Sequence, residues 1–307
     1  MSDVPSQFAD RLFEAIAEKG SPVCVGLDPV YAKLPADLRS PAATLEDEVT
    51  AIGAFCEQVI DLVAPHVPVV KPQIAHFERY GSPGLALYYQ VVVLAQDAGL
   101  IVIGDVKRGD IGSTAEAYAD AHLGTLASED EIWTWAPDAV TVNGYFGADG
   151  TEPFVRACRT NGTGLFVLVR TSNPGGAAVQ DFTGAGGKQF FVHMAEQVAV
   201  LGDADGLVGD SGYSCVGAVV GATYPQEARL LREVMPRQIF LVPGYGAQGA
   251  TAADCAAAFD ADGRGAIVNA GRSVLYAFAK QPNMAWTQAV EQAARHFAGD
   301  IASVLSG

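Results

Sequence analysis

The run Ile101-Val102-Ile103-Gly104-Asp105-Val106-Lys107-Arg108-Gly109-Asp110-Ile111 joins an apolar segment to a cluster of charged residues. Its first part has the composition of a strand that is buried on both faces, and Gly109 then interrupts the pattern. A segment of helical character follows at residues 113–123. A buried strand that ends in polar residues and leads into a helix is the repeating unit of parallel α/β folds.

The same unit recurs along the whole chain. The sequence predicts eight strands, at residues 22–27, 67–71, 101–106, 139–142, 165–170, 216–220, 239–242 and 266–269. Helices are expected near residues 45–63, 83–98, 113–123, 151–159, 188–201, 225–234, 252–259 and 286–304. One more helix, near residues 6–18, precedes the first strand.

Eight consecutive βα units predict an α/β protein with a single (β/α)8 TIM barrel and an extra N-terminal helix. An open, doubly wound sheet produces the same alternation and is the alternative fold. No Pro/Ser-rich linker divides the 307 residues, so we expect one catalytic domain over residues 1–307. The glycine-rich stretch 174–187, after the fifth strand, has the length and composition of a mobile lid.

Composition and charge restrict the class of protein. Half of the residues (50%) are hydrophobic and 18% are charged, a balance opposite to that of disordered chains. Lys and Arg number 19 against 35 Asp and Glu, which gives a formal net charge of -16. Such a chain repels phosphate backbones and anionic lipid, so we expect no nucleic-acid or membrane partner. If the ligand is an anion, a few well-placed cations must overcome this field.

The remaining compositional signals concern the cellular compartment and metals. There is no apolar run of membrane-spanning length, and residues 1–5 do not begin a signal-peptide pattern. The five cysteines are scattered and form no CxxC or Cys/His cluster. We therefore expect no disulfide framework, no metal site and a reducing, cytoplasmic location.

Charged residues gather at the ends of the second and third strands. Asp105 and Lys107 are two positions apart, so in a regular strand both point to the same side. Lys71 ends the neighbouring strand, and Asp110 follows on the loop. A run of solvated surface salt bridges is the plain interpretation of these charges, and such bridges contribute little. The functional interpretation, which we favour, is a preorganised electrostatic site with a proton-donating lysine.

A second concentration follows the seventh and eighth strands. Pro243 opens a loop with glycines at 244, 246 and 249, and Gly271 and Arg272 follow the eighth strand. In TIM barrels these two loops commonly bind phosphate through backbone N–H groups, and arginine adds a bidentate contact. The alternative for Arg272 is a rim salt bridge. The glycines also match the dinucleotide pattern G-x-G-x-x-G, but that pattern belongs after a first strand and here six strands precede it.

A neutral polar segment, Thr171-Ser172-Asn173-Pro174-Gly175, follows the fifth strand. Ser172 offers a hydroxyl to the edge of a heteroaromatic ring, although a role in forming the turn is equally compatible with the sequence.

These residues resemble the orotidine 5'-phosphate decarboxylase family, in its longer bacterial form. The most specific element is Asp105-x-Lys107-x-x-Asp110-Ile111-x-x-Thr114, which is similar to the family signature D-x-K-x-x-D-I-x-x-T. The resemblance implies a (β/α)8 barrel that converts orotidine 5'-phosphate to UMP and CO2, the last step of de novo UMP biosynthesis. It also implies that no metal or organic cofactor takes part, and that the enzyme is a homodimer with active sites at the interface.

The resemblance also assigns roles by position. Lys107 is similar to the proton donor, Asp105 to the carboxylate that faces the scissile carboxylate, and Lys71 to the lysine between Asp105 and the ribose. Asp110 and Thr114 resemble residues that the second subunit contributes.

The remaining assignments concern substrate binding. Asp28 resembles a ribose contact and Ser172 a pyrimidine contact. Gln248 is similar to the residue that links pyrimidine and phosphate, and Arg272 to the phosphate anchor.

Two other functions stay open. Related barrels that act on sugar phosphates share the D-x-K-x-x-D arrangement but use Mg²⁺, with an acidic ligand near the second strand. Here that strand ends in the cation Lys71, which repels a divalent ion. A non-catalytic nucleotide-binding protein would not need the Asp105/Lys107 pair.

Overall fold

Eight parallel strands close into a barrel in the computed structural model, which describes residues 6–124, 126–127, 132–133 and 135–305. The order around the barrel is β1-β10-β9-β8-β7-β6-β3-β2, so each strand pairs with its neighbours along the chain and β1 pairs with β10. This closure confirms the TIM barrel and excludes the open sheet. The strands are β1 Val23–Leu27, β2 Val69–Pro72, β3 Ile101–Arg108, β6 Ala139–Val142, β7 Gly164–Arg170, β8 Ser214–Val220, β9 Gln238–Pro243 and β10 Ala266–Ala270.

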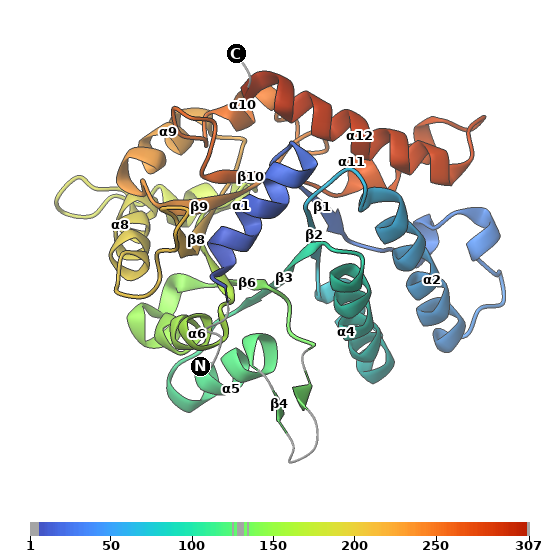
Figure 1. Ribbon diagram of the computed structural model, residues 1–307, viewed down its shortest axis with the longest axis horizontal. Helices are drawn as coiled ribbons and strands as arrows, with labels where there is room; N and C mark the ends of the chain where they lie inside the picture. The colour runs from blue at the N-terminus through green and yellow to red at the C-terminus, as the bar shows by residue number, and fades with distance from the viewer. Residues whose placement is uncertain (1–5, 125, 128–131, 134, 306–307) are drawn as a thin grey trace.

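Helices cover the outside of the barrel (Figure 1). Strands such as β1 and β8 are buried along their whole length, as strands enclosed by helices must be. The covering helices are α2 Leu45–Val63, α4 Gly81–Asp97, α5 Gly112–Leu123, α6 Ala148–Asn161, α8 Phe190–Gly202, α9 Pro225–Val234, α10 Ala252–Ala256 and α12 Trp286–Leu305.

Local chemistry sets several helix boundaries. At the start of α2, the Thr44 side chain accepts a hydrogen bond from the Asp47 amide and Asp47 accepts one from the Thr44 amide, which forms a capping box. Thr251 and Asp254 form the same arrangement at α10. The predicted bounds of α2 and α9 are confirmed, whereas α10 ends three residues earlier than expected.

The extra N-terminal helix, α1 (Phe8–Lys19), closes one end of the barrel and lies across it in Figure 1. Its Asp10 carboxylate accepts hydrogen bonds from the Asp210 and Ser211 amides at 3.1 and 2.7 Å, in the loop that precedes β8. Arg11 pairs at 2.8 Å with Asp138, immediately before β6. Since α1 occupies the amino ends of the strands, a ligand enters from the carboxyl ends.

Some short elements were not expected. They are α3 Ala75–Glu78, α7 Ala177–Gln180, α11 Arg272–Leu275 and an antiparallel pair, β4 Leu126–Ala127 with β5 Ile132–Trp133. Each is four residues or shorter, too short for the hydrophobic periodicity that reveals longer elements. The ends of the expected domain, residues 1–5 and 306–307, lie outside the described residues. No helix in the described part of the chain has the length and apolar character needed to span a membrane.

Candidate active site

The carboxyl ends of β2 and β3 bring Lys71, Asp105 and Lys107 into one cluster, which we call the charged cluster. Lys71 Nζ donates to Asp105 Oδ2 at 2.7 Å, and Lys107 Nζ donates to Oδ1 of the same carboxylate. Two neutral donors complete the set: Gln73 Nε2 lies 2.9 Å from Oδ2, and Thr141 Oγ1 lies 2.8 Å from Oδ1. A single carboxylate is thus held between two ammonium groups, and each of its oxygens accepts two hydrogen bonds.

Burial separates this cluster from an ordinary surface ion pair. The side chains of Lys71 and Asp105 are 7% and 9% exposed, whereas that of Lys107 is 45% exposed. Burial alone would raise the pKa of Asp105, but the charges of Lys71 and Lys107 outweigh it and hold that pKa well below its usual range. Burial would lower the pKa of Lys71, but the charges of Asp105 and Asp28 outweigh it and raise that pKa. Lys71 and Asp105 are therefore both charged at neutral pH, and Lys107 is the member of the cluster most open to a ligand.

The backbone of β3 is irregular where it carries these groups. Gly104 pairs with Val140 and Arg108 pairs with Val142, so Thr141 alone faces the three residues 105–107 of β3. Within this bulge Lys107 has φ 46°, and among the described residues it is the one non-glycine residue with positive φ. The sequence predicts that Asp105 and Lys107 meet because they alternate regularly in a strand. The two side chains do form an ion pair, but the strand between them is bulged rather than regular.

A second group of the expected residues lines a cavity of about 330 Å³ between the loops that follow β1, β9 and β10. Asp28, Gln248, Gly271 and Arg272 all contribute to it. Gln248 and Arg272 are exposed, and within the described residues no carboxylate pairs with Arg272. The guanidinium is thus available to an anion rather than used in a rim salt bridge.

The glycine loop beside this cavity is well defined. Gly244, Gly246 and Gly249 have φ values of 125°, 67° and 93°, which only glycine adopts readily. Tyr245 fastens the loop to α12, because its hydroxyl donates to Asp300 Oδ2 at 2.6 Å and its ring lies 4.8 Å from that of Phe297. Pro243 ends β9 just before this loop.

Two residues that line the cavity carry polar atoms with no partner in the described part of the chain. Asp28 Oδ1 and Asn269 Oδ1 are buried and lack a hydrogen bond. The backbone of Gly271 approaches so closely that a Cβ there would lie 3.2 Å from Asp28 Oδ2. Buried polar groups are almost always satisfied, so these atoms mark a place for a polar ligand. Asp28 also reinforces the charge on Lys71 and thereby links the cavity to the charged cluster.

Three expected residues lie apart from both groups. Asp110 accepts a hydrogen bond from the Ile111 amide at 2.8 Å, and Thr114 is exposed in the first turn of α5. Ser172 is partly buried after β7, where its carbonyl accepts from Thr223 Oγ1 at 3.4 Å. No hydrogen bond or ion pair within the described part of the chain joins these three to the charged cluster.

The segment 174–187 is anchored at its base by Arg170, the last residue of β7. The guanidinium is 1% exposed, pairs with Glu227 at 2.5 Å and with Asp181 at 2.7 Å, and lies over the ring of Tyr224. Gln180 accepts from the Thr171 amide at 3.0 Å. The expected role of this segment as a lid stays a prediction.

Sequence reasoning missed four residues of the site: Gln73, Thr141, Asn269 and Tyr276. Tyr276 donates to the Asp28 carbonyl at 3.0 Å and accepts from the Val30 amide at 2.9 Å. The available signal for Thr141 was its place as the one polar residue in the otherwise apolar strand Ala139–Val142.

The donor set does not suit a metal ion. The charged cluster offers one carboxylate flanked by two ammonium groups, which repel a divalent cation. Across the described ranges, no three His, Cys, Asp or Glu side chains converge in a way that could hold a metal.

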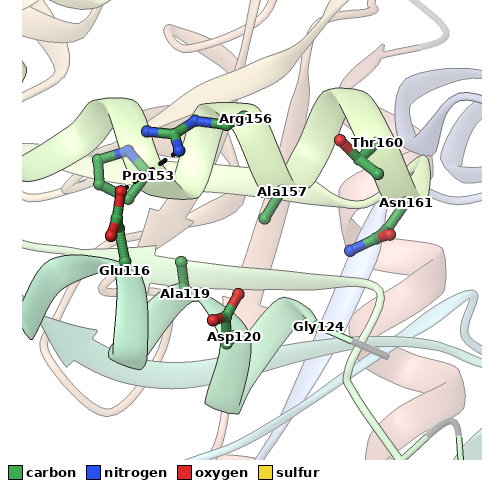
Figure 2. Close-up of a pocket in the computed structure, with 9 residues that line it drawn as sticks. All are labelled: Glu116, Ala119, Asp120, Gly124, Pro153, Arg156, Ala157, Thr160 and Asn161. Atoms are coloured by element: carbon green, nitrogen blue, oxygen red, sulfur yellow. Dashed lines mark hydrogen bonds and ion pairs between the residues drawn. The ribbon is translucent and has the colours of Figure 1, made fainter. Parts of the chain in front are cut away.

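A larger hollow lies away from the strand ends, between α5 and α6 (Figure 2). It measures about 570 Å³, and Arg156 of α6 reaches across it to Glu116 of α5 at 3.3 Å. Because both side chains are about half exposed, this groove resembles an ordinary helix–helix surface more than a preorganised site.

Comparison with known proteins gives a consistent result. Residues 21–288 match the model of the "Orotidine 5'-phosphate decarboxylase / HUMPS family". The chain is 49% identical over 280 residues to orotidine 5'-phosphate decarboxylase of Rhodopirellula baltica, with 89% of this chain and 90% of that protein covered. Identity to the enzyme of Deinococcus radiodurans is 43%, with coverages of 88% and 89%. The structure of Leishmania donovani OMP decarboxylase superposes with a TM-score of 0.76 at 28% identity, over 98% of this chain and 99% of the other.

Proposed function

The chain belongs to the orotidine 5'-phosphate decarboxylase / HUMPS family, and we propose that it converts orotidine 5'-phosphate to UMP and CO2, the last step of de novo UMP biosynthesis. It is then a carboxy-lyase. The observation that carries this proposal is the Asp105 carboxylate, buried and held between Lys71 and Lys107 at the open end of the barrel.

The charged cluster suits the chemistry of this reaction. Breaking the bond between C6 of the pyrimidine and the carboxylate leaves an electron pair on C6, and CO2 departs. The Lys107 ammonium stabilises that pair and then donates its proton to C6, after which solvent reprotonates the amine. Lys107 is exposed enough for this exchange, whereas Lys71 is buried and holds Asp105 in place.

The cavity beside the cluster suits the rest of the substrate. Asp28 and Asn269 offer unpaired polar atoms for the ribose hydroxyls. Arg272 offers a guanidinium for the phosphate, and Gly271 and the glycine loop after Pro243 offer backbone N–H groups, with Gln248 beside them. Ser172, on the neighbouring loop, is assigned to the pyrimidine. Binding energy from the phosphate is then available to order the loops around the reacting carbon.

The decisive assay follows pyrimidine absorbance when the protein is mixed with orotidine 5'-phosphate in the presence of EDTA. We expect full conversion to UMP with and without the chelator, because two ammonium groups occupy the place where a metal ligand would be needed. Activity that EDTA abolishes and Mg²⁺ restores would favour the related sugar-phosphate enzymes. No conversion under any condition would favour a non-catalytic binding protein, and fluorescence-detected binding of NAD(H) would favour a dinucleotide enzyme.

We also infer a homodimer in which Asp110 and Thr114 complete the partner's active site. Both residues lie apart from the cavity of their own chain. Exposed apolar side chains lie near this segment. Ile111, next to Asp110, is 56% exposed; Phe146, which with the Asp110 carbonyl borders Gly150, is 47% exposed, and Tyr145, in ring contact with Phe146, is 73% exposed. An apolar patch beside an incomplete site supports a second copy as its cover.

A complementation experiment tests the shared site. Asp110→Ala and Lys107→Ala are each expected to be inactive, but exchange of subunits between them creates one intact site in each mixed dimer. We expect activity to return to about a quarter of that of the unsubstituted enzyme, since half of the dimers are mixed and half of their sites are intact. A monomer in sedimentation analysis, or no recovery after proven subunit exchange, would contradict the dimer.

The location and domain structure are part of the same proposal. We place the enzyme in the cytoplasm, which agrees with the five free, buried cysteines. A single catalytic domain agrees with one closed sheet whose strands run from Val23 to Ala270.

A further inference from the structure

Thr141 occupies a special place in the barrel. It lies in the middle of β6, is 1% exposed, and faces the bulge of β3 that contains Asp105 and Lys107. Its hydroxyl has two partners. Oγ1 accepts a hydrogen bond from the Lys107 backbone amide at 3.1 Å and donates one to Asp105 Oδ1 at 2.8 Å.

The bulge explains why a side chain is needed at this point. In a regular parallel ladder the Lys107 amide would find a carbonyl on β6, but the register slips between Gly104 and Arg108. The ladder resumes only where the Asn143 amide donates to the Arg108 carbonyl at 2.8 Å. The Thr141 hydroxyl therefore takes the place of the missing backbone acceptor.

The same bond supports a backbone conformation that is unfavourable for lysine. With φ 46°, Lys107 lies in the left-handed region, where a non-glycine residue persists only if its surroundings hold it. The Thr141 hydroxyl accepts a hydrogen bond from the Lys107 backbone amide, and the Asp105 carboxylate accepts one from the ammonium group of the same lysine.

We propose that Thr141 is a positioning residue for the decarboxylation. One hydroxyl orients both the carboxylate of Asp105 and the backbone from which Lys107 projects, and thereby sets the ammonium group relative to the reacting carbon. This inference rests on the proposed function. It predicts that Thr141 acts on the chemical step, because the groups that bind phosphate and ribose lie on other loops.

The test replaces the hydroxyl while keeping the shape. Thr141→Val has the same branching, but it leaves the Lys107 amide without its acceptor and removes one of the two donors to Asp105 Oδ1, where the Lys107 ammonium remains. We expect kcat for orotidine 5'-phosphate to fall about 10- to 100-fold. The KM should change less than about threefold, since a loss confined to the transition state leaves ground-state binding intact. Thr141→Ser restores the hydroxyl and should keep kcat within about threefold of that of the unsubstituted enzyme.

Thr163→Val is the matched control. Thr163 is also buried, but it immediately precedes β7 at the opposite end of the barrel, so kcat should not change. If Thr141→Val does not fold, Thr141→Cys keeps the size of the side chain with a weaker donor and acceptor, and kcat should fall severalfold. An unchanged kcat in the Val or Cys variant, or a loss that serine does not restore, would overturn the role of Thr141. Failure of the proposed function is separate, because the unsubstituted enzyme would then not convert the substrate.

Discussion

The charged cluster and the rim to which we assign the phosphate (Gln248, Gly271 and Arg272) lie at the same end of the barrel but are built in opposite ways. In the cluster, Lys71 and Asp105 are buried and every oxygen of the carboxylate is already bonded. On the rim, Arg272 is exposed and has no carboxylate partner within the described residues. A group that is paired before the substrate arrives does not reorganise during the reaction, whereas an unpaired group gains its bonds from the substrate. The cluster is therefore expected to control the chemical step, and the rim to control binding.

The largest expected effect comes from removing the exposed ammonium of the cluster. Lys107→Ala loses both the stabilising charge and the proton donor, so kcat should fall by more than about 10⁴-fold. UMP binding should stay measurable by calorimetry, because the rim is untouched. Lys19→Ala is the control: this lysine ends α1 and pairs with Glu18 at 2.9 Å. Substantial turnover by Lys107→Ala would remove the distinction between the two regions.

A smaller effect, of a different kind, is expected on the rim. Arg272→Ala removes the charged hydrogen-bond donor that we propose for the phosphate, so KM for orotidine 5'-phosphate should rise about 10- to 100-fold. Turnover of orotidine, which lacks the phosphate, should be almost unaffected. Arg229→Ala, an exposed arginine on α9, is the matched control. Equal losses for both substrates would show that Arg272 does not bind phosphate.

The smallest expected effect is the pH dependence of KM and kcat, which should differ between the rim and the charged cluster. Burial favours a raised pKa for Asp105, but the charges of Lys71 and Lys107 outweigh it and hold the pKa well below the ordinary 3.8. A lowered carboxyl pKa leaves the charge, and the stability that depends on it, intact above that ordinary value, with loss only in strong acid. The second pKa of a phosphate monoester is about 6, so the substrate loses charge between pH 7.5 and 5.5. We expect KM to rise severalfold over this interval.

The same titration should leave the ionisation of Asp105 unchanged. The Lys71 ammonium also keeps its charge, since Asp105 and Asp28 outweigh the effect of burial and raise its pKa. We therefore expect kcat at saturating substrate to vary less than about twofold between pH 7.5 and 5.5. A kcat that falls with an apparent pKa near 6 would mean that a group of the cluster titrates where the structure holds it charged.

The accuracy of the sequence-based predictions differed between the two regions. The rim could be predicted from composition, because Gly244, Gly246 and Gly249 cluster after the seventh predicted strand and Gly271 and Arg272 follow the eighth. For the cluster, the sequence identifies Lys71, Asp105 and Lys107, but the i and i+2 argument assumes a regular strand. The bulge of β3, the left-handed backbone of Lys107 and the two bonds of Thr141 do not follow from that argument.

The amino-acid sequence alone determined the eight βα units, because hydrophobic periodicity and turn residues are local signals. The closure of their strands into a barrel rather than an open sheet is seen in the structure. The sequence also determined which strand ends carry charge, since the residue types stand in the sequence itself. The tertiary structure alone decided how those charges are paired and which are buried. Asp105 bonds to residues 34 and 36 positions away along the chain, Lys71 and Thr141. Only the register of β2, β3 and β6 in the closed barrel brings such distant residues to one carboxylate, and register depends on the packing of the whole barrel.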